Sequence, residues 1–309
     1  MRSLLSIGEL SPEDLGQILA LSRAPAVGAP LGGKGVAMVF EHPSARTRSA
    51  CEMAVVGLGG HPVAIAGGEV GIDSRESAED VALTLSCYHC LIAARTARHS
   101  ALERMRAALE AAGSDVGVLN LLSDREHPTQ ALADLLTIVG HFGSLEGRVV
   151  TYVGDANNVC RSLVGLAALS GMRARVAAPA AYSLSADDVS WAAGLGAAPE
   201  CLEDPLEAAT GADVLYTDVW VSMGQGADEA ARQAALAGYR LDERLVEAAA
   251  PGAVVMHCLP AHRGEEISAA VLDGPRSIVW DQARNRMHAL SGVIRYLSGE
   301  RTPGPGFPR

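Results

Sequence analysis

The sequence predicts an α/β protein built from two doubly wound domains, each with a parallel sheet. Its 309 residues suit two domains at roughly 150 residues per domain. Short apolar runs alternate with longer amphipathic segments, and this alternation is typical of parallel strands joined by right-handed helical crossovers. A glycine-rich break near Gly140–Gly147 separates four predicted strands from about five more. We therefore expect a first domain over residues 1–140 and a second over 145–285.

The predicted strands are short apolar runs bounded by glycine or polar residues. Those of the first domain are Val36–Phe40, Pro62–Ala66, Leu91–Ala94 and Gly117–Leu119. Those of the second are Val149–Val153, Ala174–Ala178, Val214–Thr217, Val254–Cys258 and Ile278–Trp280. Because helix-like segments separate most of these runs, neighbouring strands are expected to run parallel.

Helical periodicity fills most intervals between the strands. The predicted helices are Glu76–Leu85, Ala101–Ala112, Gln130–His141, Leu241–Ala250 and Ala283–Leu297. A further helix is expected to open near the N-terminus, where Ser11 is a suitable N-cap and Pro12 suits the first turn. The last helix has no later strand to cover, so its part over about 286–299 is expected to pack on the first domain. Residues 300–309 are expected to form a disordered tail.

The composition excludes several classes of protein. The chain has 36 acidic and 25 basic residues, a net charge of −11, which argues against a general nucleic-acid binder. It has no uncharged apolar run of about 18 residues, so no membrane association is expected. Its first residues do not resemble a signal peptide, and its six cysteines suit buried free thiols. These features favour a cytoplasmic protein.

A candidate anion site follows the first predicted strand. Ligands of doubly wound sheets bind beyond the C-terminal ends of the strands. Residues Ser44–Arg48 follow Val36–Phe40 at a predicted helix start, where hydroxyl, guanidinium and free N–H groups suit a phosphate. A capped helix with a solvated basic turn is the alternative. Because basic residues in a first turn oppose the helix dipole, a bound anion explains them better.

Other polar residues also follow predicted strands. Arg95 directly follows the third run, although a lone arginine there is more often a surface residue. His127 and Gln130 lie three residues apart at a helix start, so both can face one carbonyl oxygen, the alternative being a simple His-Pro turn. Asp218 directly follows its predicted strand, where its carboxylate is well placed to face a ligand ammonium. Cys258 is either part of that site or a buried structural thiol.

Four motifs in chain order resemble those of the aspartate/ornithine carbamoyltransferase family, and most closely those of its ornithine-specific members. They are Ser44–Arg48, His127–Gln130, Asp218–Gly224 and His257–Pro260. The resemblance covers nearly the whole chain. It implies transfer of the carbamoyl group of carbamoyl phosphate to the side-chain amine of L-ornithine, giving L-citrulline and phosphate. It also implies a site in the cleft between the domains, a homotrimer or a multiple of trimers, and no metal or organic cofactor.

The resemblance assigns roles to the matching residues. The carbamoyl-phosphate-binding set it implies is Ser44, Ala45, Arg46, Thr47, Arg95, His127, Gln130, Cys258, Leu259 and Arg286. The ornithine-binding set it implies is Asn158, Asp218, Ser222 and Met223. The catalytic groups it implies are Arg95, His127, Asp218, Cys258 and Arg286.

The sequence departs from the family pattern at a few positions. Ala45 replaces a threonine, Cys51 a phenylalanine and Arg284 a glutamate, and the Val70–Arg75 loop contains no glutamine to bind the donor. The leading interpretation is an enzyme that uses ornithine. The alternatives are a paralogous carbamoyltransferase that uses another amine and a non-catalytic binding relative. Biosynthetic and catabolic roles would use the same residues.

Overall fold

The computed structural model describes residues 1–221 and 229–302, which divide into two compact units. Of the described residues, the first unit comprises 1–136 and 285–302, and the second comprises 137–221 and 229–284. Each unit is an α/β structure with its own parallel sheet, so the predicted fold class is confirmed. Among the described helices, none combines the length and apolar character needed to cross a membrane.

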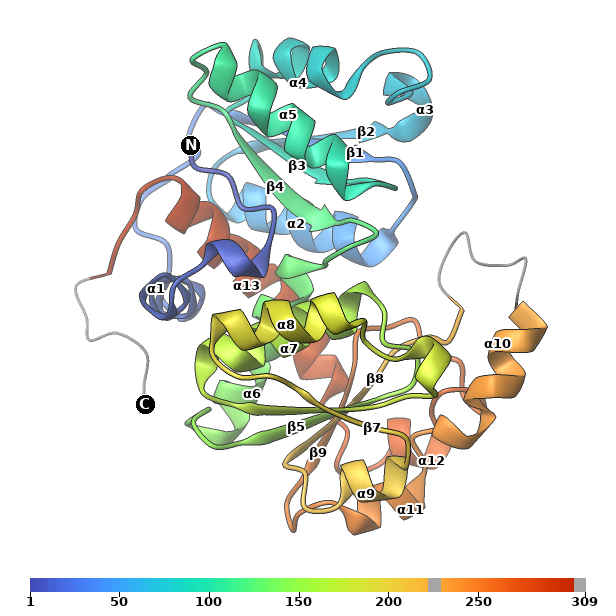
Figure 1. Cartoon of the computed structure of the whole chain (residues 1–309). Coiled ribbons are helices and arrows are strands. Elements are labelled where there is room, and N and C mark those ends of the chain that lie inside the picture. Colours follow the sequence, from blue (N-terminus) through green and yellow to red (C-terminus); the bar gives the residue numbers. More distant parts are fainter. Residues whose placement is uncertain (222–228, 303–309) are drawn as a thin grey trace. The chain divides into compact units, whose positions relative to one another are not determined.

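The sheet of the first unit has four parallel strands in the order β2-β1-β3-β4 (Figure 1). They are β1 (Gly35–Phe40), β2 (His61–Ala66), β3 (Leu91–Arg95) and β4 (Gly117–Leu122). All four predicted strands are present. β4 runs three residues beyond its prediction because buried Asn120 continues it, with its side-chain amide donating to the carbonyl of Leu5 at 2.8 Å.

Helices cover both faces of this sheet. They are η1 (Ile7–Glu9), α1 (Pro12–Arg23), α2 (Ala45–Gly57), α3 (Gly67–Val70), α4 (Ala78–Ser86) and α5 (His99–Ala111). Apolar side chains of α4 and α5 pack on one face of the sheet, and α2 lies on the other (Figure 1). The predicted start of α1 is confirmed, because the side chain of Ser11 accepts from the backbone of Asp14 and that of Asp14 accepts from the backbone of Ser11.

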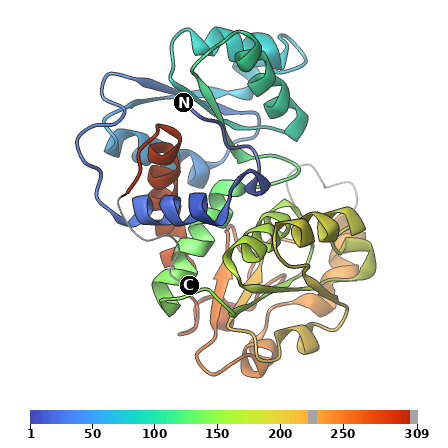
Figure 2. The same cartoon turned by 60° about the vertical axis from the view of Figure 1, so that its left-hand side comes forward.

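Two helices carry the chain from one unit to the other, α6 (Pro128–Phe142) and α13 (Val279–Leu297). The later part of α13 packs closely on α1, and both views show the two helices side by side (Figures 1 and 2). Gly292 permits this approach, since a Cβ there would lie 2.1 Å from Ser22 Oγ. Arg295 is buried in the contact and donates to the carbonyls of Leu21 and Ala24 at 2.7 Å.

The sheet of the second unit has five parallel strands in the order β7-β6-β5-β8-β9. They are β5 (Val149–Val153), β6 (Arg173–Ala177), β7 (Glu200–Leu202), β8 (Val214–Thr217) and β9 (Val254–His257). The helices of this unit are α7 (Asn158–Ser170), η2 (Ala180–Tyr182), α8 (Ala186–Leu195), α9 (Pro205–Ala209), α10 (Glu229–Leu236), η4 (Ala237–Tyr239), α11 (Glu243–Ala248) and α12 (Ala269–Leu272). Side chains of α9, α11 and α12 pack on one face of the sheet, against residues such as Leu215 and Val255.

The prediction of a strand at Ile278–Trp280 is wrong. Only a single bridge joins Ser277 to Val255 of β9, and α13 begins at Val279. Val279 and Gln282 are buried, whereas Trp280 is 61% exposed, which is the spacing of a helix and not of a strand. A run of three apolar residues cannot separate the two alternatives. Arg286 is therefore presented by a helix and not by a strand end.

The fifth strand of this sheet is β7, which was not predicted. It lies at the sheet edge, where it pairs with β6 through Arg175 and Glu200. Its residues are Glu200, Cys201 and Leu202, of which the first two are exposed. A strand this short, with little apolar character, leaves no clear pattern in the sequence.

Candidate active site

The N-terminus of α2 brings together two hydroxyl groups and a guanidinium. Ser44 is the N-cap, and its Oγ accepts from the backbone N–H of Thr47 at 3.3 Å. The Ser44 hydroxyl donates to Thr47 Oγ1 at 3.1 Å, and Arg286 of α13 donates to the same oxygen at 2.7 Å. Because Thr47 Oγ1 accepts both bonds, its own proton is directed elsewhere. Ala45 and Arg46, also predicted site residues, are exposed in the first turn of α2.

Arg95 and His127 are buried in the same unit. Arg95 is the last residue of β3, and His127 directly precedes α6. Burial lowers the pKa of His127 well below its ordinary value of 6.5, and the positive charges of Arg286 and Arg95 lower it further. The imidazole is therefore neutral near pH 7 and lies within the field of two guanidinium groups. The two guanidinium groups provide positive charge for an anionic ligand, and the uncharged imidazole can form a hydrogen bond with a polar group of that ligand.

Gln130 lies one helical turn beyond His127, on the same side of α6. Its side chain is 1% exposed, and its Nε2 donates to Asp134 Oδ1 at 2.8 Å. Its Oε1 is buried and has no hydrogen-bond partner among the described residues. The side-chain amide thus has its donor end engaged and an acceptor oxygen open.

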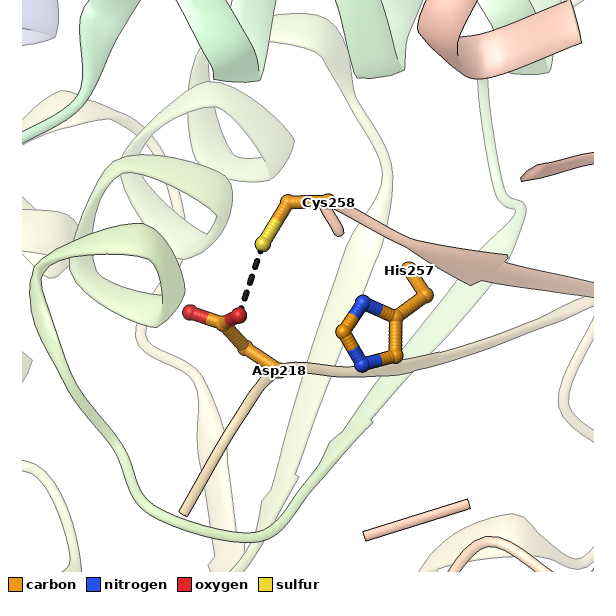
Figure 3. A group of neighbouring side chains, drawn as sticks. All are labelled: Asp218, His257 and Cys258. Carbon is orange, nitrogen blue, oxygen red and sulfur yellow. Dashed lines mark hydrogen bonds between the residues drawn. The ribbon is translucent and has the colours of Figure 1, made fainter. Parts of the chain in front are cut away.

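In the second unit, Asp218 and Cys258 lie at the ends of neighbouring strands, β8 and β9 (Figure 3). The thiol of Cys258 donates to Asp218 Oδ1 at 2.8 Å, and the backbone N–H of Val219 donates to the same oxygen at 2.8 Å. Asn157 Nδ2 donates to Asp218 Oδ2 at 2.9 Å. The buried carboxylate is therefore held by three donors.

A buried histidine and a buried glutamate stabilise the turn after β9 through hydrogen bonds. The backbone N–H of Leu259 donates to His257 Nδ1 at 2.9 Å, and His257 Nε2 lies 3.1 Å from Glu266 Oε1. Since Nδ1 accepts, Nε2 carries the ring proton and donates to Glu266. Leu259 has a φ of 61°, an unfavourable value for a residue with a side chain. We infer that the His257 contact helps to maintain this conformation.

Asp218, His257 and Cys258 also have the spacing of a possible metal site, with ligand atoms within 4.8 Å of one another (Figure 3). Both ring nitrogens of His257 already take part in hydrogen bonds, to Leu259 and to Glu266. The thiol of Cys258 is likewise engaged with Asp218. These contacts describe a hydrogen-bond network better than an open set of metal ligands.

Both parts of the chain match one protein family. Residues 2–140 match the carbamoyl-P binding domain of aspartate/ornithine carbamoyltransferases, and residues 146–297 match the Asp/Orn binding domain of the same family. The chain belongs to the aspartate/ornithine carbamoyltransferase family.

Similar proteins support this assignment over nearly the full length. An ornithine carbamoyltransferase from Parafrankia sp. is 50% identical over 281 residues, covering 90% of this chain and 87% of the relative. One from Methanoculleus marisnigri is 42% identical, covering 96% of each chain. The solved structure of the enzyme from Pyrococcus furiosus has a TM-score of 0.90 at 38% identity, covering 97% of this chain and 98% of that one.

The structure also places the residues at which the chain departs from the family pattern. Arg284 is exposed and forms an ion pair with Asp281 at 2.7 Å. In the Val70–Arg75 loop, Asp73 pairs with Arg104 of α5, and this contact lowers the pKa of Asp73. Cys51 is fully buried, which raises the pKa of its thiol to about 12.

Not every predicted site residue is placed, and several residues of the site region were not predicted. Ser222 and Met223 lie outside the described residues. Asn158 is the first residue of α7, and its neighbour Asn157, which caps α7 and was not predicted, donates to Asp218. An asparagine directly before a helix is a recognisable cap signal. The other residues missed were Asp134, His257 as a positioning residue, and Glu266.

A buried ion pair beside Asp218 leads to a prediction about pH. Arg232 of α10 lies 2.7 Å from Asp155, in the loop after β5. Burial raises the pKa of Asp155 from 3.8 to about 6, and the charge of Asp218 adds to the rise, although Arg232 opposes it. The folded protein therefore holds this proton more tightly than the unfolded chain does. The contribution of Asp155 to stability is largest below the unfolded pKa and is lost as pH rises through about 6.

We expect this pH dependence to disappear in Asp155→Asn. Between about pH 7 and about pH 5, the free energy of unfolding of the wild type should rise relative to that of the variant by about 1 kcal/mol. Guanidinium denaturation of both proteins at the two pH values measures this difference. A constant difference between the two proteins would contradict the raised pKa.

Proposed function

We propose that this chain transfers the carbamoyl group of carbamoyl phosphate to the side-chain amine of L-ornithine, giving L-citrulline and phosphate. The observation that carries the proposal is the buried group of Thr47, His127 and Arg286 in the first unit. It combines hydroxyl, imidazole and guanidinium groups suited to an acyl phosphate. The preference for ornithine is supported by the Asp218–Cys258 pair and by the full-length relatives that are ornithine carbamoyltransferases.

The donor phosphate is assigned to the N-terminus of α2. The Thr47 hydroxyl and the N–H groups of the first turn, including that of Ala45, would donate to the phosphate oxygens, and the Ser44 hydroxyl would rotate from Thr47 Oγ1 to do the same. The guanidinium groups of Arg46, Arg95 and Arg286 would balance its charge. Because the N–H of Ala45 does not depend on its side chain, the missing family threonine costs only one hydroxyl group.

The carbamoyl group is assigned to His127 and Gln130. The neutral imidazole of His127 would donate to the carbonyl oxygen, where negative charge grows during attack, supported by Arg95 and Arg286. The resemblance gave Gln130 the same donor role. However, Asp134 takes an amide proton of Gln130 and leaves Oε1 open, so we assign Oε1 to the –NH2 of the carbamoyl group, which can donate to it.

The acceptor amine is assigned to the second unit. A side-chain ammonium with a pKa of ~10.4 must lose a proton before its nitrogen can attack. The Asp218 carboxylate would orient the ammonium, and Cys258 would lie near it. Attack on the carbonyl carbon forms a C–N bond, the C–O bond to phosphate then breaks, and the nitrogen loses a second proton. Asn158, Ser222 and Met223 would bind the rest of the amino acid.

The proposal is tested by supplying purified protein with carbamoyl phosphate and a panel of amines. L-Ornithine, L-lysine, L-2,4-diaminobutyrate and L-aspartate differ in chain length and charge. The highest kcat/KM is expected with ornithine, and citrulline should be the product. Turnover with another amine and not with ornithine would identify a paralogous enzyme. Binding of carbamoyl phosphate without turnover of any amine would identify a non-catalytic relative.

A homotrimer in the cytoplasm stays a prediction from the family resemblance. Exposed apolar side chains on α2 support an interface there, since Met53 is 55% and Val56 is 51% exposed, one helical turn apart. We expect Met53→Glu/Val56→Glu to lower the molar mass in solution from trimer to monomer, as measured by light scattering.

Val27→Glu is a matched control for this charge change. Val27 is 84% exposed but lies in the loop between α1 and β1, outside α2. The control should keep the mass of the wild type. A wild-type monomer, or a double variant that remains trimeric, would contradict the assigned interface.

A further inference from the structure

The buried carboxylate of Asp134 fixes which end of the Gln130 amide is available to a ligand. Asp134 is fully buried on α6, four residues after Gln130, and accepts from Gln130 Nε2 at 2.8 Å. An ionised carboxylate has acceptors and no donor. If the amide were reversed, Gln130 Oε1 would face a carboxylate oxygen, and two acceptors would repel each other in a buried site. The amide therefore has a single favourable orientation.

In this orientation the amide oxygen of Gln130 lacks a hydrogen-bond donor among the described residues. Gln130 Oε1 is buried and lacks a hydrogen-bond partner among the described residues, which is uncommon for a buried polar atom. Residues 127, 130 and 134 have the spacing of one helix face, so Gln130 lies between His127 and Asp134 along α6. A ligand that binds beside His127 can therefore reach Oε1, and it should carry an N–H or O–H donor.

We propose that Asp134 is a specificity-determining positioning residue, which makes the donor site prefer a carbamoyl group to an acetyl group. The proposal rests on the function proposed above and deepens it. Carbamoyl and acetyl groups are nearly isosteric and share the carbonyl, but the first carries –NH2 where the second carries –CH3. The –NH2 donates to Gln130 Oε1, whereas a methyl group would keep that oxygen buried and unsatisfied.

The preference depends on Asp134 acting through Gln130. In Asp134→Asn the side chain keeps its size but gains a donor, so either orientation of the Gln130 amide finds a partner. When the amide is reversed, its –NH2 faces the ligand in place of its oxygen, so the carbamoyl nitrogen loses its hydrogen-bond acceptor. The variant should therefore lose selectivity through weaker binding of the carbamoyl ligand. Asp134→Glu keeps an acceptor-only group and should retain more of the preference.

Two stable analogues isolate this effect from turnover. Phosphonoacetamide carries the carbamoyl –NH2, and acetonylphosphonate carries a methyl group in its place. Calorimetric titration of the wild type is expected to show tighter binding of phosphonoacetamide, on the order of threefold to tenfold, the range for one hydrogen bond. In Gln130→Ala the ratio of the affinities for phosphonoacetamide and acetonylphosphonate should approach one. In Asp134→Asn the same ratio should fall to about two or less.

The double variant separates a positioning role from a merely structural one. Adding Asp134→Asn to Gln130→Ala should leave the ratio of the two affinities unchanged, since no amide remains to be oriented. A general weakening of the site would lower both affinities together and keep the wild-type ratio. If Asp134→Asn does not fold, Asp134→Ala carries the same expectation for the ratio.

Each result has a defined consequence. If the wild type forms citrulline but Asp134→Asn keeps the wild-type ratio, the role of Asp134 is overturned and the proposed function stands. A change of ratio on adding Asp134→Asn to Gln130→Ala would also overturn that role. If the wild type neither binds phosphonoacetamide nor forms citrulline, both proposals are overturned.

Discussion

Arg286→Ala is expected to lower kcat/KM for carbamoyl phosphate by about 10²–10³-fold, the range for loss of a group that stabilises charge in the transition state. Arg286 is 5% exposed and donates to Thr47 Oγ1 at 2.7 Å. Its removal takes a buried positive charge from the assigned phosphate site. It also leaves Thr47 without one of its donors. Steady-state kinetics with varied carbamoyl phosphate measures the effect.

A second readout follows from the environment of His127. Arg286 is one of the two charges that lower the pKa of this imidazole, so the variant should raise that pKa towards its ordinary value. NMR titration of the ring measures this shift directly. The control is Arg284→Ala, since Arg284 lies on the same helix but is exposed and paired with Asp281. A similar loss of activity in the control would contradict the specific role of Arg286.

Asp218→Asn is expected to raise the KM for ornithine and to lower kcat, for a combined loss of about 10²-fold in kcat/KM for ornithine. The substitution keeps the shape of the side chain but removes its charge. Asp218 accepts from Cys258, Val219 and Asn157, and an asparagine amide would direct its own N–H protons at some of these donors. The thiol of Cys258 and the assigned position of the ammonium would both be disturbed.

Kinetics with varied ornithine at saturating carbamoyl phosphate measures this second effect. Asp187→Asn makes the same chemical change at an exposed position in α8 and should leave both parameters unchanged. An unchanged KM for ornithine in Asp218→Asn would remove the basis for assigning the acceptor to this carboxylate.

The sequence predicts most of this fold because most of its strands are buried along nearly their whole length. Runs such as Val149–Val153 and Val214–Thr217 are buried along their whole length, and both are strands at the predicted residues. Where the local pattern is weak, prediction fails. The segment Ile278–Trp280 is as short as a helical turn, and β7 has two exposed residues among three.

The candidate site could be predicted from the sequence where a residue directly follows a predicted strand. Asp218 and Arg95 could be selected in this way, because the sheet topology brings strand ends together. The supporting residues have no such signal. Glu266 contacts His257 across a loop of irregular structure, and Asn157 contacts Asp218 from the residue that precedes α7. Asp134 is the exception, since its i,i+4 spacing from Gln130 is visible in the sequence.

We propose that the first unit binds the carbamoyl donor and that the second binds the amine. Calorimetric titration of phosphonoacetamide into Arg286→Ala and Asp218→Asn, with the wild type as reference, tests it most directly. We expect at least about tenfold weaker binding to Arg286→Ala, since a charge-assisted contact is lost, and wild-type affinity in Asp218→Asn. Equal weakening in both variants, or a loss confined to Asp218→Asn, would contradict it.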